Sequence, residues 1–174
     1  MLTNDIATIK QLKDLVPIYK KAFKKHNIFK QSDKEIFAYL KETHQKYLPF
    51  GGGYIVSMID DPLMKIKDKV IGAILVAFKG IDAKKHMRIE LKHLAVEPKY
   101  QSIGAATDLI NISLDKLYFA IRNENASSAK IEVRVSDNEK SLKLFKKLGF
   151  KEEGKLKDHY RLGESCHILG FLIK

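Results

Sequence analysis

The chain has 174 residues, of which 45% are hydrophobic and 30% are charged, and its 32 lysines and arginines against 21 acidic residues give a net charge of +11. This length favours one domain, and this composition excludes a disordered or fibrous protein. The longest apolar run, Val70 to Phe78, has nine residues, whereas a transmembrane helix needs roughly 20. The amino terminus lacks the pattern of a secretory signal. We therefore expect a cytoplasmic protein that does not enter a membrane.

The positive charge favours anionic partners, such as nucleic acid, the ribosome or a phosphorylated cofactor. The lysines are dispersed along the chain, which is typical of a solvated surface, and we expect no nucleic-acid groove. A single cysteine, Cys166, can form neither an internal disulfide nor a zinc cluster. We predict no metal site and assign Cys166 to an ordinary strand.

The first third of the chain predicts two helices. A short apolar strand beginning at Ile6 is followed by apolar residues at helical spacing, namely Leu12, Leu15, Val16, Tyr19 and Phe23. Ser32 and Glu35 have the spacing of a capping box and predict the start of a second helix, which ends before Pro49. The glycines at 51–53 form a loop, since no helix pattern with Lys-Ser/Thr follows them.

The rest of the chain alternates between apolar strands and helices. Three strands, Tyr54–Ile59, Val70–Phe78 and Met87–Val96, are separated by short turns, including one at Lys79-Gly80, and are expected to be antiparallel neighbours. A long helix from Gly104 to Arg122, a strand at Ile131–Val135, a helix at Asn138–Leu148 and a last strand at Cys166–Ile173 follow. This order predicts an α+β fold, a mixed sheet flanked by helices.

The segment from Leu94 to Ala106 carries the clearest chemical signal. A buried-type strand is followed by a proline turn and then by the start of the long helix. The first N–H groups of a helix lack internal partners and lie at the positive end of its dipole, so they bind phosphate. Gly104 permits close approach of the backbone to a ligand. An ordinary strand–turn–helix junction is the alternative interpretation.

At this segment the sequence resembles the GCN5-related N-acetyltransferase (GNAT) family. The motif Gln101-x-x-Gly104-x-Ala106 matches one family signature, and the run from Asn138 to Gly149-Phe150 matches a second. The resemblance implies a single domain, 1–174, with a variable helical acceptor-side region at 1–50 and an acetyl-CoA-binding core at 54–174. It also implies that the strands Met87–Val96 and Ile131–Val135 splay apart.

The resemblance is strongest to amino-terminal and ribosomal-protein acetyltransferases, because those members carry runs similar to Glu132-Val133-Arg134 and His159-Tyr160-Arg161. It implies that acetyl-CoA is the cosubstrate and that a defined set of residues binds it: Leu94, Ala95, Val96, Gln101, Ser102, Ile103, Gly104, Ala105, Ala106, Asn138 and Phe145. For Asn138, a plain role at the start of a helix is the alternative.

Two glutamates and one of two tyrosines are candidates for catalysis. Glu90 and Glu132 occupy positions at which different branches of the family place a general base, and by strand alternation Glu90 shares a face with Leu94 and Val96. His93 then lies on the opposite face, where we expect it to pack. Many members carry a tyrosine at the position of Phe145, where its hydroxyl protonates the leaving thiolate. Phenylalanine cannot do this, and Tyr160 or Tyr118 is the candidate substitute.

The leading hypothesis is an N-acetyltransferase that moves an acetyl group from acetyl-CoA to a primary amine by direct attack with general-base assistance. The acceptor is a protein amino terminus or a small amine such as a polyamine or aminoglycoside, and the resemblance is compatible with a homodimer. The alternative is a basic nucleic-acid- or ribosome-associated module with the same fold and weak or no catalysis. The net charge and Phe145 favour that alternative.

Overall fold

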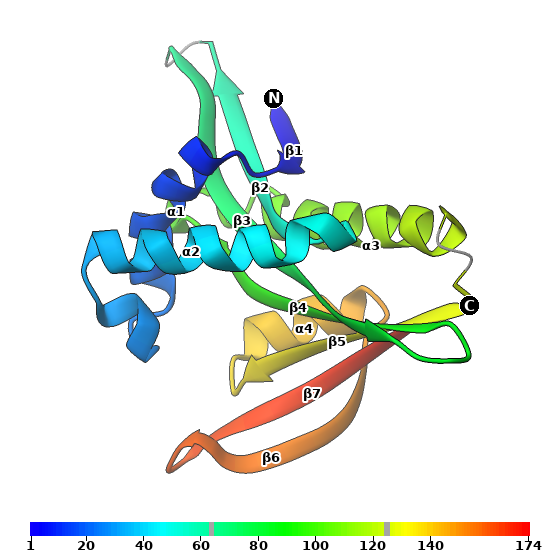
Figure 1. Ribbon diagram of the computed structural model, residues 1–174. Helices are drawn as coiled ribbons and strands as arrows, with labels where there is room; N and C mark the ends of the chain where they lie inside the picture. The colour runs from blue at the N-terminus through cyan, green and yellow to red at the C-terminus, as the bar shows by residue number, and fades with distance from the viewer. Residues whose placement is uncertain (63–64, 124–125) are drawn as a thin grey trace. The chain divides into compact units, whose positions relative to one another are not determined.

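The computed structural model describes residues 1–62, 65–123 and 126–174. Their strands follow the hydrogen-bonded order β1-β2-β3-β4-β5-β7-β6 (Figure 1). The strands are β1 (Leu2–Ile6), β2 (Gly53–Asp61), β3 (Ile66–Ile81), β4 (His86–Val96), β5 (Ser128–Ser136), β6 (Lys151–Arg161) and β7 (Glu164–Ile173). The helices are α1 (Ile9–Ala22), α2 (Asp33–Tyr47), α3 (Ala105–Asn123) and α4 (Glu139–Lys147). Because β4 and β5 are parallel while β5–β7 and β6–β7 are antiparallel, the sheet is mixed, and the expected α+β fold is confirmed.

The described residues form two compact units. Unit 1 comprises residues 1–76 and 93–116, and unit 2 comprises residues 77–92 and 117–174. Each of β3, β4 and α3 contributes residues to both units. The expectation of a single domain concerns the arrangement of the two units and stays a prediction.

In unit 1 the two predicted helices begin at capping boxes. Ser32 accepts a hydrogen bond from the backbone of Glu35, whose side chain accepts one from the backbone of Ser32, as the sequence predicts. Thr8 and Gln11 form the same arrangement at the start of α1. The two helices pack against each other, and α2 also packs against β2. This packing forms the apolar interior of the region expected to face the acceptor.

Strands β3 and β4 approach closely at Gly72 in unit 1. A Cβ atom built on Gly72 would lie 2.6 Å from the carbonyl oxygen of Ala95 and 3.1 Å from the Cα atom of Val96. The N–H of Glu97 donates to the carbonyl of Ile71 over 2.7 Å. Glycine at position 72 therefore fixes the path of the backbone at the end of β4, which the resemblance assigns to the cofactor.

In unit 2 the sheet extends beyond the predicted strands. β5 pairs with β4 on one side and with β7 on the other, and β6 forms an antiparallel hairpin with β7 (Figure 1, orange to red). The sequence analysis missed β6. Ten of its eleven residues are exposed and only Gly154 is half-buried, so no apolar alternation indicates this edge strand.

The end of β3 also differs from the sequence prediction. The turn predicted at Lys79-Gly80 is wrong, because β3 continues to Ile81. The chain turns after Asp82, whose carboxylate accepts hydrogen bonds from the backbone of Lys84 at 2.9 Å and of His86 at 3.0 Å. This extension gives Lys79 a place in unit 2 next to β4.

Across the described ranges, no helix has the length and apolar character needed to cross a membrane.

We predict that Gly72→Ala destabilises the protein by about 1–3 kcal/mol, because the added methyl group forces the backbones of β3 and β4 apart. Gly154→Ala is the matched control, since its Cβ atom would meet only Ile168 at an ordinary 3.9 Å, and we expect a change within about 0.5 kcal/mol. Urea unfolding of both variants measures the difference. Equal stability of the two variants would contradict the close approach at Gly72.

Candidate active site

The register of β4 and β5 sets charged side chains of equal sign opposite each other. Arg88 is the partner of Lys130, and Glu90 is the partner of Glu132. Because side chains alternate between faces along a strand, these residues share one face of unit 2 with the next charged residues of the two strands. We call this set the charged face: Arg88, Glu90, Lys92, Lys130, Glu132 and Arg134.

The paired segment of β4 and β5 ends before the strands do. Their register runs from His86↔Ser128 to Leu91↔Val133, whereas β4 continues to Val96 and β5 to Ser136. The two strands thus each extend past their paired segment, as the expectation of splayed central strands requires.

Glu90 lies at the floor of the charged face, where its residue surface is only 6% exposed. Its carboxylate accepts a 2.9 Å contact from Lys79 and lies 3.7 Å from Lys92 and 4.0 Å from the Nε atom of Arg134. The same Nε atom donates to Glu132 over 3.0 Å. Three cations therefore neutralise two adjacent carboxylates.

These contacts set the protonation state of Glu90. Burial raises the pKa of the Glu90 carboxyl. The hydrogen bond from Lys79 and the charges of Lys92, Lys79 and Arg134 together lower it by a larger amount, so the pKa lies below its ordinary value. Glu90 is therefore ionised at neutral pH. An ionised carboxylate can bind an ammonium group and accept its proton, although a low pKa weakens the base.

The charged face lines a groove of about 950 Å³ in unit 2. The turn after β3 and the end of β7 complete its walls, with Asp82, His86, Leu172 and Lys174 among the lining residues. The volume lies in the range of small-ligand sites, about 300–1,000 Å³. A short extended segment of polypeptide or a small amine fits a groove of this size.

The start of α3 in unit 1 contains the turn at which the sequence predicts anion binding. Gly104 has φ of +90°, and a Cβ atom built on it would meet nothing within 4 Å. The first backbone bond of α3 runs from the N–H of Asp108 to the carbonyl of Gly104, so the N–H groups of residues 105–107 have no partner within the helix. The side chain of Gln101 donates to the carbonyl of Val96 over 3.1 Å and ties this turn to the end of β4.

The backbone of β4 changes direction at His93. This residue has φ of +52°, a left-handed conformation that is uncommon for a non-glycine residue. It interrupts the strict alternation from which the sequence analysis placed Glu90 and Leu94 on one face, so that argument does not hold. Nothing in the residue pattern of the strand indicates this bulge.

His93 packs among aromatic rings of unit 1, as expected for a packing residue. Its Nδ1 atom lies 3.0 Å from the hydroxyl of Tyr54, and ring centroids of α1, α2 and the segment between them lie 5.5–6.1 Å away. These rings belong to Tyr19, Phe23, Phe29 and Tyr39. The bulge is therefore held by the helical region that the resemblance assigns to the acceptor side.

Asn138 and Phe145 belong to α4 in unit 2. Asn138 is the N-cap residue of α4, and its side-chain oxygen accepts a bond from the N–H of Ser141 over 3.0 Å. A contact with the cofactor would have to use its NH₂ group. Phe145 is 2% exposed and packs edge-on against Phe150, with 5.2 Å between ring centroids. Both roles in cofactor binding stay predictions.

Tyr160 lies on β6 in unit 2, and its hydroxyl donates to the sulfur of Cys166 over 3.5 Å. Burial and this contact raise the pKa of Tyr160 above its ordinary value, so the phenol keeps its proton at neutral pH. Cys166 is fully buried on β7, as expected of an ordinary strand residue. The raised pKa keeps this proton on Tyr160 and makes its phenol a weaker acid than that of an ordinary tyrosine.

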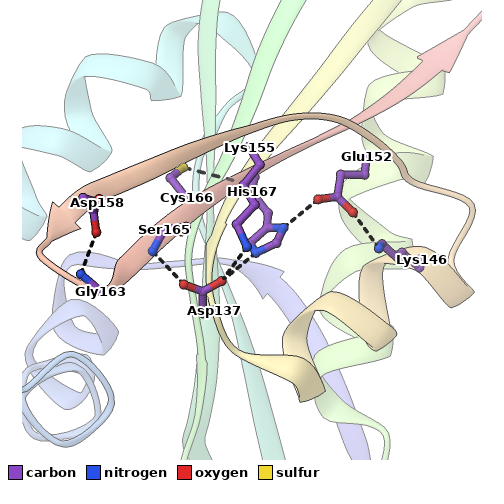
Figure 2. Close-up of polar contacts among 9 residues, drawn as sticks. All are labelled: Asp137, Lys146, Glu152, Lys155, Asp158, Gly163, Ser165, Cys166 and His167. Atoms are coloured by element: carbon purple, nitrogen blue, oxygen red, sulfur yellow. Dashed lines mark hydrogen bonds and ion pairs between the residues drawn. The ribbon is translucent and has the colours of Figure 1, made fainter.

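A second polar cluster stabilises the segment before Asn138 (Figure 2). The ring of His167 on β7 lies 2.8 Å from Asp137 and 2.6 Å from Glu152, with one ring nitrogen toward each carboxylate. Since carboxylates only accept, both nitrogens donate and the ring is an imidazolium. Asp137 also accepts from the backbone of Ser165, and Glu152 accepts from Lys146.

The carboxylates and the imidazolium shift one another's pKa. The bonds to Glu152 and Asp137 raise the pKa of His167 above its ordinary value. The bonds from Ser165 and His167 lower the pKa of Asp137 to about 2. The bonds from Lys146 and His167 lower the pKa of Glu152 to about 2. This cluster joins β6, β7 and the connection between β5 and α4.

Residues 14–150 match the model of the acetyltransferase (GNAT) family. The chain belongs to the GNAT acetyltransferase family. The family resemblance of the two sequence motifs is confirmed, and membership of the family supports the expectation of an acetyl-CoA-dependent acetyltransferase. The alternative of a binding module without catalysis is not favoured by this finding.

Similar proteins include acetyltransferases that act on protein amino groups. An N-alpha-acetyltransferase from Sulfurisphaera tokodaii is 36% identical over 76 residues, which are 44% of this chain and 43% of that protein. The match thus spans less than half the length of that relative. The solved NatC complex bound to Gag peptide and CoA has a chain with TM-score 0.74 and 16% identity, covering 99% of both chains.

The ribosomal-protein-S18-alanine N-acetyltransferase of Escherichia coli has TM-score 0.65 and 19% identity, covering 100% of this chain and 95% of that one. At these identities the two solved structures show a shared fold.

The residues of this GNAT protein fit the diphosphate of acetyl-CoA. The open space at Gly104 and the unpartnered N–H groups at the start of α3 form a cradle that a side chain at position 104 would fill. The sequence motif predicted this turn as the anion site, and that role stays a prediction. The cations around Glu90 were missed, because Lys79 and Arg134 reach it only through strand register.

We predict that His167→Gln lowers the melting temperature by a few degrees near pH 5.5 and much less near pH 9. The raised pKa of His167 means that its charged form stabilises the fold fully below its ordinary pKa of 6.5, and that this stabilisation is lost as the pH rises through the folded value. The lowered pKa values of Asp137 and Glu152 keep both carboxylates charged in this window.

Thermal unfolding of the wild type and the variant at both pH values measures this effect. The control is His159→Gln, because His159 is an exposed residue of β6 whose ring packs on Tyr160. An equal loss for His167→Gln at the two pH values would contradict the assignment of an imidazolium.

Proposed function

We propose that this protein transfers an acetyl group from acetyl-CoA to the α-amino group of a polypeptide by direct attack of the neutral amine. The observation that carries the proposal is the Glu90–Glu132 pair at the floor of a groove in unit 2. A pair of carboxylates attracts an ammonium group, and the ionised Glu90 can accept its proton. The names of the similar proteins support a polypeptide acceptor.

Unit 1 supplies the anion-binding turn in this proposal. Acetyl-CoA supplies a thioester whose acetyl group ends on the acceptor nitrogen. The N–H groups from Ser102 to Ala106 bind its diphosphate, whereas the N–H of Gln101 already donates to the carbonyl of Pro98 over 3.3 Å. The backbone of Leu94 and Val96 binds its pantetheine arm as an added strand. The N–H of Val96 stabilises the negative charge that develops on the carbonyl oxygen.

Unit 2 supplies the carboxylates that prepare the acceptor. An α-amino group has an ordinary pKa of about 8, so it must lose a proton before it attacks. Glu90 is the favoured base. Glu132 is the second candidate, because Arg134 contacts both carboxylates. The lowered pKa of Glu90 keeps the base ionised and ready, and an intervening water extends its reach.

The leaving thiolate needs a proton or a stabilising group, and the buried phenyl ring of Phe145 provides neither. Tyr160 is the substitute acid in the proposal, since its phenol stays protonated. Asn138 contributes its side-chain NH₂ group to cofactor binding and its oxygen to the cap of α4.

A polypeptide acceptor is favoured over a polyamine or aminoglycoside. Polycationic acceptors need an acidic cleft, and the acidic residues of β6 and β7 already have partners. Glu152 pairs with Lys146 and His167, Glu153 with Lys130, and Glu164 with Arg161. The groove in unit 2 is instead rich in cations.

We predict that Gly104→Glu weakens binding of CoA by at least about tenfold. The new side chain fills the space beside the first turn of α3 and adds a charge that repels the diphosphate. Isothermal titration calorimetry with CoA measures the affinity, and circular dichroism checks that the variant is folded.

The matched control is Gly51→Glu. Gly51 also has a positive φ, +72°, and open space around its Cβ position. This variant therefore carries similar backbone strain at a site outside the turn that precedes α3. CoA affinity that is unchanged in folded Gly104→Glu would overturn the assignment of the diphosphate site.

We predict that Glu90→Gln lowers kcat by about 10²–10⁴-fold, the usual contribution of general-base catalysis, while CoA affinity changes little. Glutamine keeps the shape of the side chain and removes its basicity. Steady-state assays of thiol release with a peptide acceptor give kcat, and calorimetry gives CoA affinity.

Glu132→Gln is the internal comparison. A large loss in that variant with normal turnover of Glu90→Gln would transfer the base to Glu132. Near-normal turnover of both variants would exclude a carboxylate base.

A further inference from the structure

The charged face breaks a rule of sheet stability. Like charges directly opposite each other on neighbouring strands are destabilising, and this face has two such rows, Arg88 with Lys130 and Glu90 with Glu132. Such violations concentrate at functional sites, where the cost is retained for another purpose. The carboxylate row already has a use in the proposed reaction, whereas the cationic row has none.

The cationic row is only partly neutralised. Lys130 pairs with Glu153 of β6. Among the described residues, no carboxylate lies within 4 Å of Arg88, whereas Lys79 and Lys92 both reach Glu90. Arg88 is exposed and lines the groove together with Lys174. The charge of Arg88 acts on the carboxyl of Asp82 in the same groove, but no carboxylate of the described residues forms an ion pair with the Arg88 guanidinium group, which can therefore bind a further one.

The two rows form an ordered pattern along the strands. They are two residues apart, which corresponds to about 6.6 Å along a strand. An extended polypeptide has the same rise per residue, and its first and third residues face the same side. If the α-amino group lies at the Glu90–Glu132 row, a carboxylate on the third residue reaches the Arg88–Lys130 row.

We propose that the Arg88–Lys130 row selects acceptor polypeptides with an aspartate or glutamate at the third residue. This specificity rests on the proposed function, because it takes the carboxylate row as the place of the acceptor amine. Arg88 is the principal specificity-determining residue, and its guanidinium group binds the acceptor carboxylate through paired N–H donors. Lys130 and Lys174 add positive charge around it.

Nucleic acid is a less suitable occupant of this groove. A phosphate chain running along the face would pass the Glu90–Glu132 row, whose carboxylates only accept hydrogen bonds and so offer phosphate no donor. An acceptor with an ammonium group at one end and a carboxylate two residues on matches both rows. Charge complementarity therefore favours an acidic amino-terminal segment.

Three peptides that differ only at the third residue test the proposal: Ser-Ala-Glu, Ser-Ala-Gln and Ser-Ala-Lys, each followed by the same neutral sequence. Steady-state acetylation gives kcat and KM for each peptide, and fluorescence anisotropy of labelled peptides gives binding to the protein with CoA present. We expect the Glu peptide to have a KM and a Kd about tenfold lower than the Lys peptide.

Arg88→Glu reverses the charge of the row. We expect it to reverse the order of the peptides in both KM and Kd while kcat at saturation changes little. Lys147→Glu is the matched control, since it makes the same charge change at an exposed residue of α4 in the same unit and should leave the order unchanged.

The outcomes separate the two proposals. Acetylation of all three peptides with equal KM and Kd, or an unchanged order in Arg88→Glu, overturns the specificity and leaves the acetylation of polypeptides standing. Charge-ordered binding with no acetylation supports the groove assignment and contradicts the proposed function. Displacement of the Glu peptide by a 20-nucleotide RNA at nanomolar concentration overturns the specificity in favour of a nucleic-acid site.

Discussion

The parallel register of β4 and β5 places Glu90 opposite Glu132, and the proposed chemistry of unit 2 depends on this pairing. Side chains alternate between the faces of a strand, so a slip by one residue would move one carboxylate to the other face. The apolar alternation on the opposite face, with Ile89 and Ile131 both buried, holds the register. The same hydrophobic constraint that builds the sheet thus sets the distance between the charged groups.

The buried carboxylate of Glu90 stays ionised because of the cations around it. Burial alone would raise the pKa of Glu90, and Lys79, Lys92 and Arg134 reverse that effect. Lys79 reaches the site because β3 continues past the glycine at which a turn was expected. Glu90 is therefore a base of low pKa, which binds an ammonium group more readily than it accepts that group's proton. Because the acceptor's own pKa is only about 8, a weak base suffices to deprotonate it.

Much of the fold follows from local sequence signals, and the electrostatics of the site do not. The helices begin at side-chain caps such as Ser32, and the apolar strands β2, β3 and β4 show buried-type runs, so both are predictable. β6 has no apolar face to reveal it. The bulge at His93 depends on contacts with α1 and α2, and the cations of Glu90 come from three separate segments. Glu90 and Glu132 themselves were found through family resemblance.

A crystal structure with CoA covalently joined to the amino terminus of a Ser-Ala-Glu peptide tests the central claim most directly. The account predicts that the nitrogen of the first residue lies beside Glu90 and Glu132 and that the carboxylate of the third residue lies within about 4 Å of the Arg88 guanidinium group. A conjugate bound with its peptide outside the groove, or with that carboxylate turned away from the Arg88–Lys130 row, would contradict it.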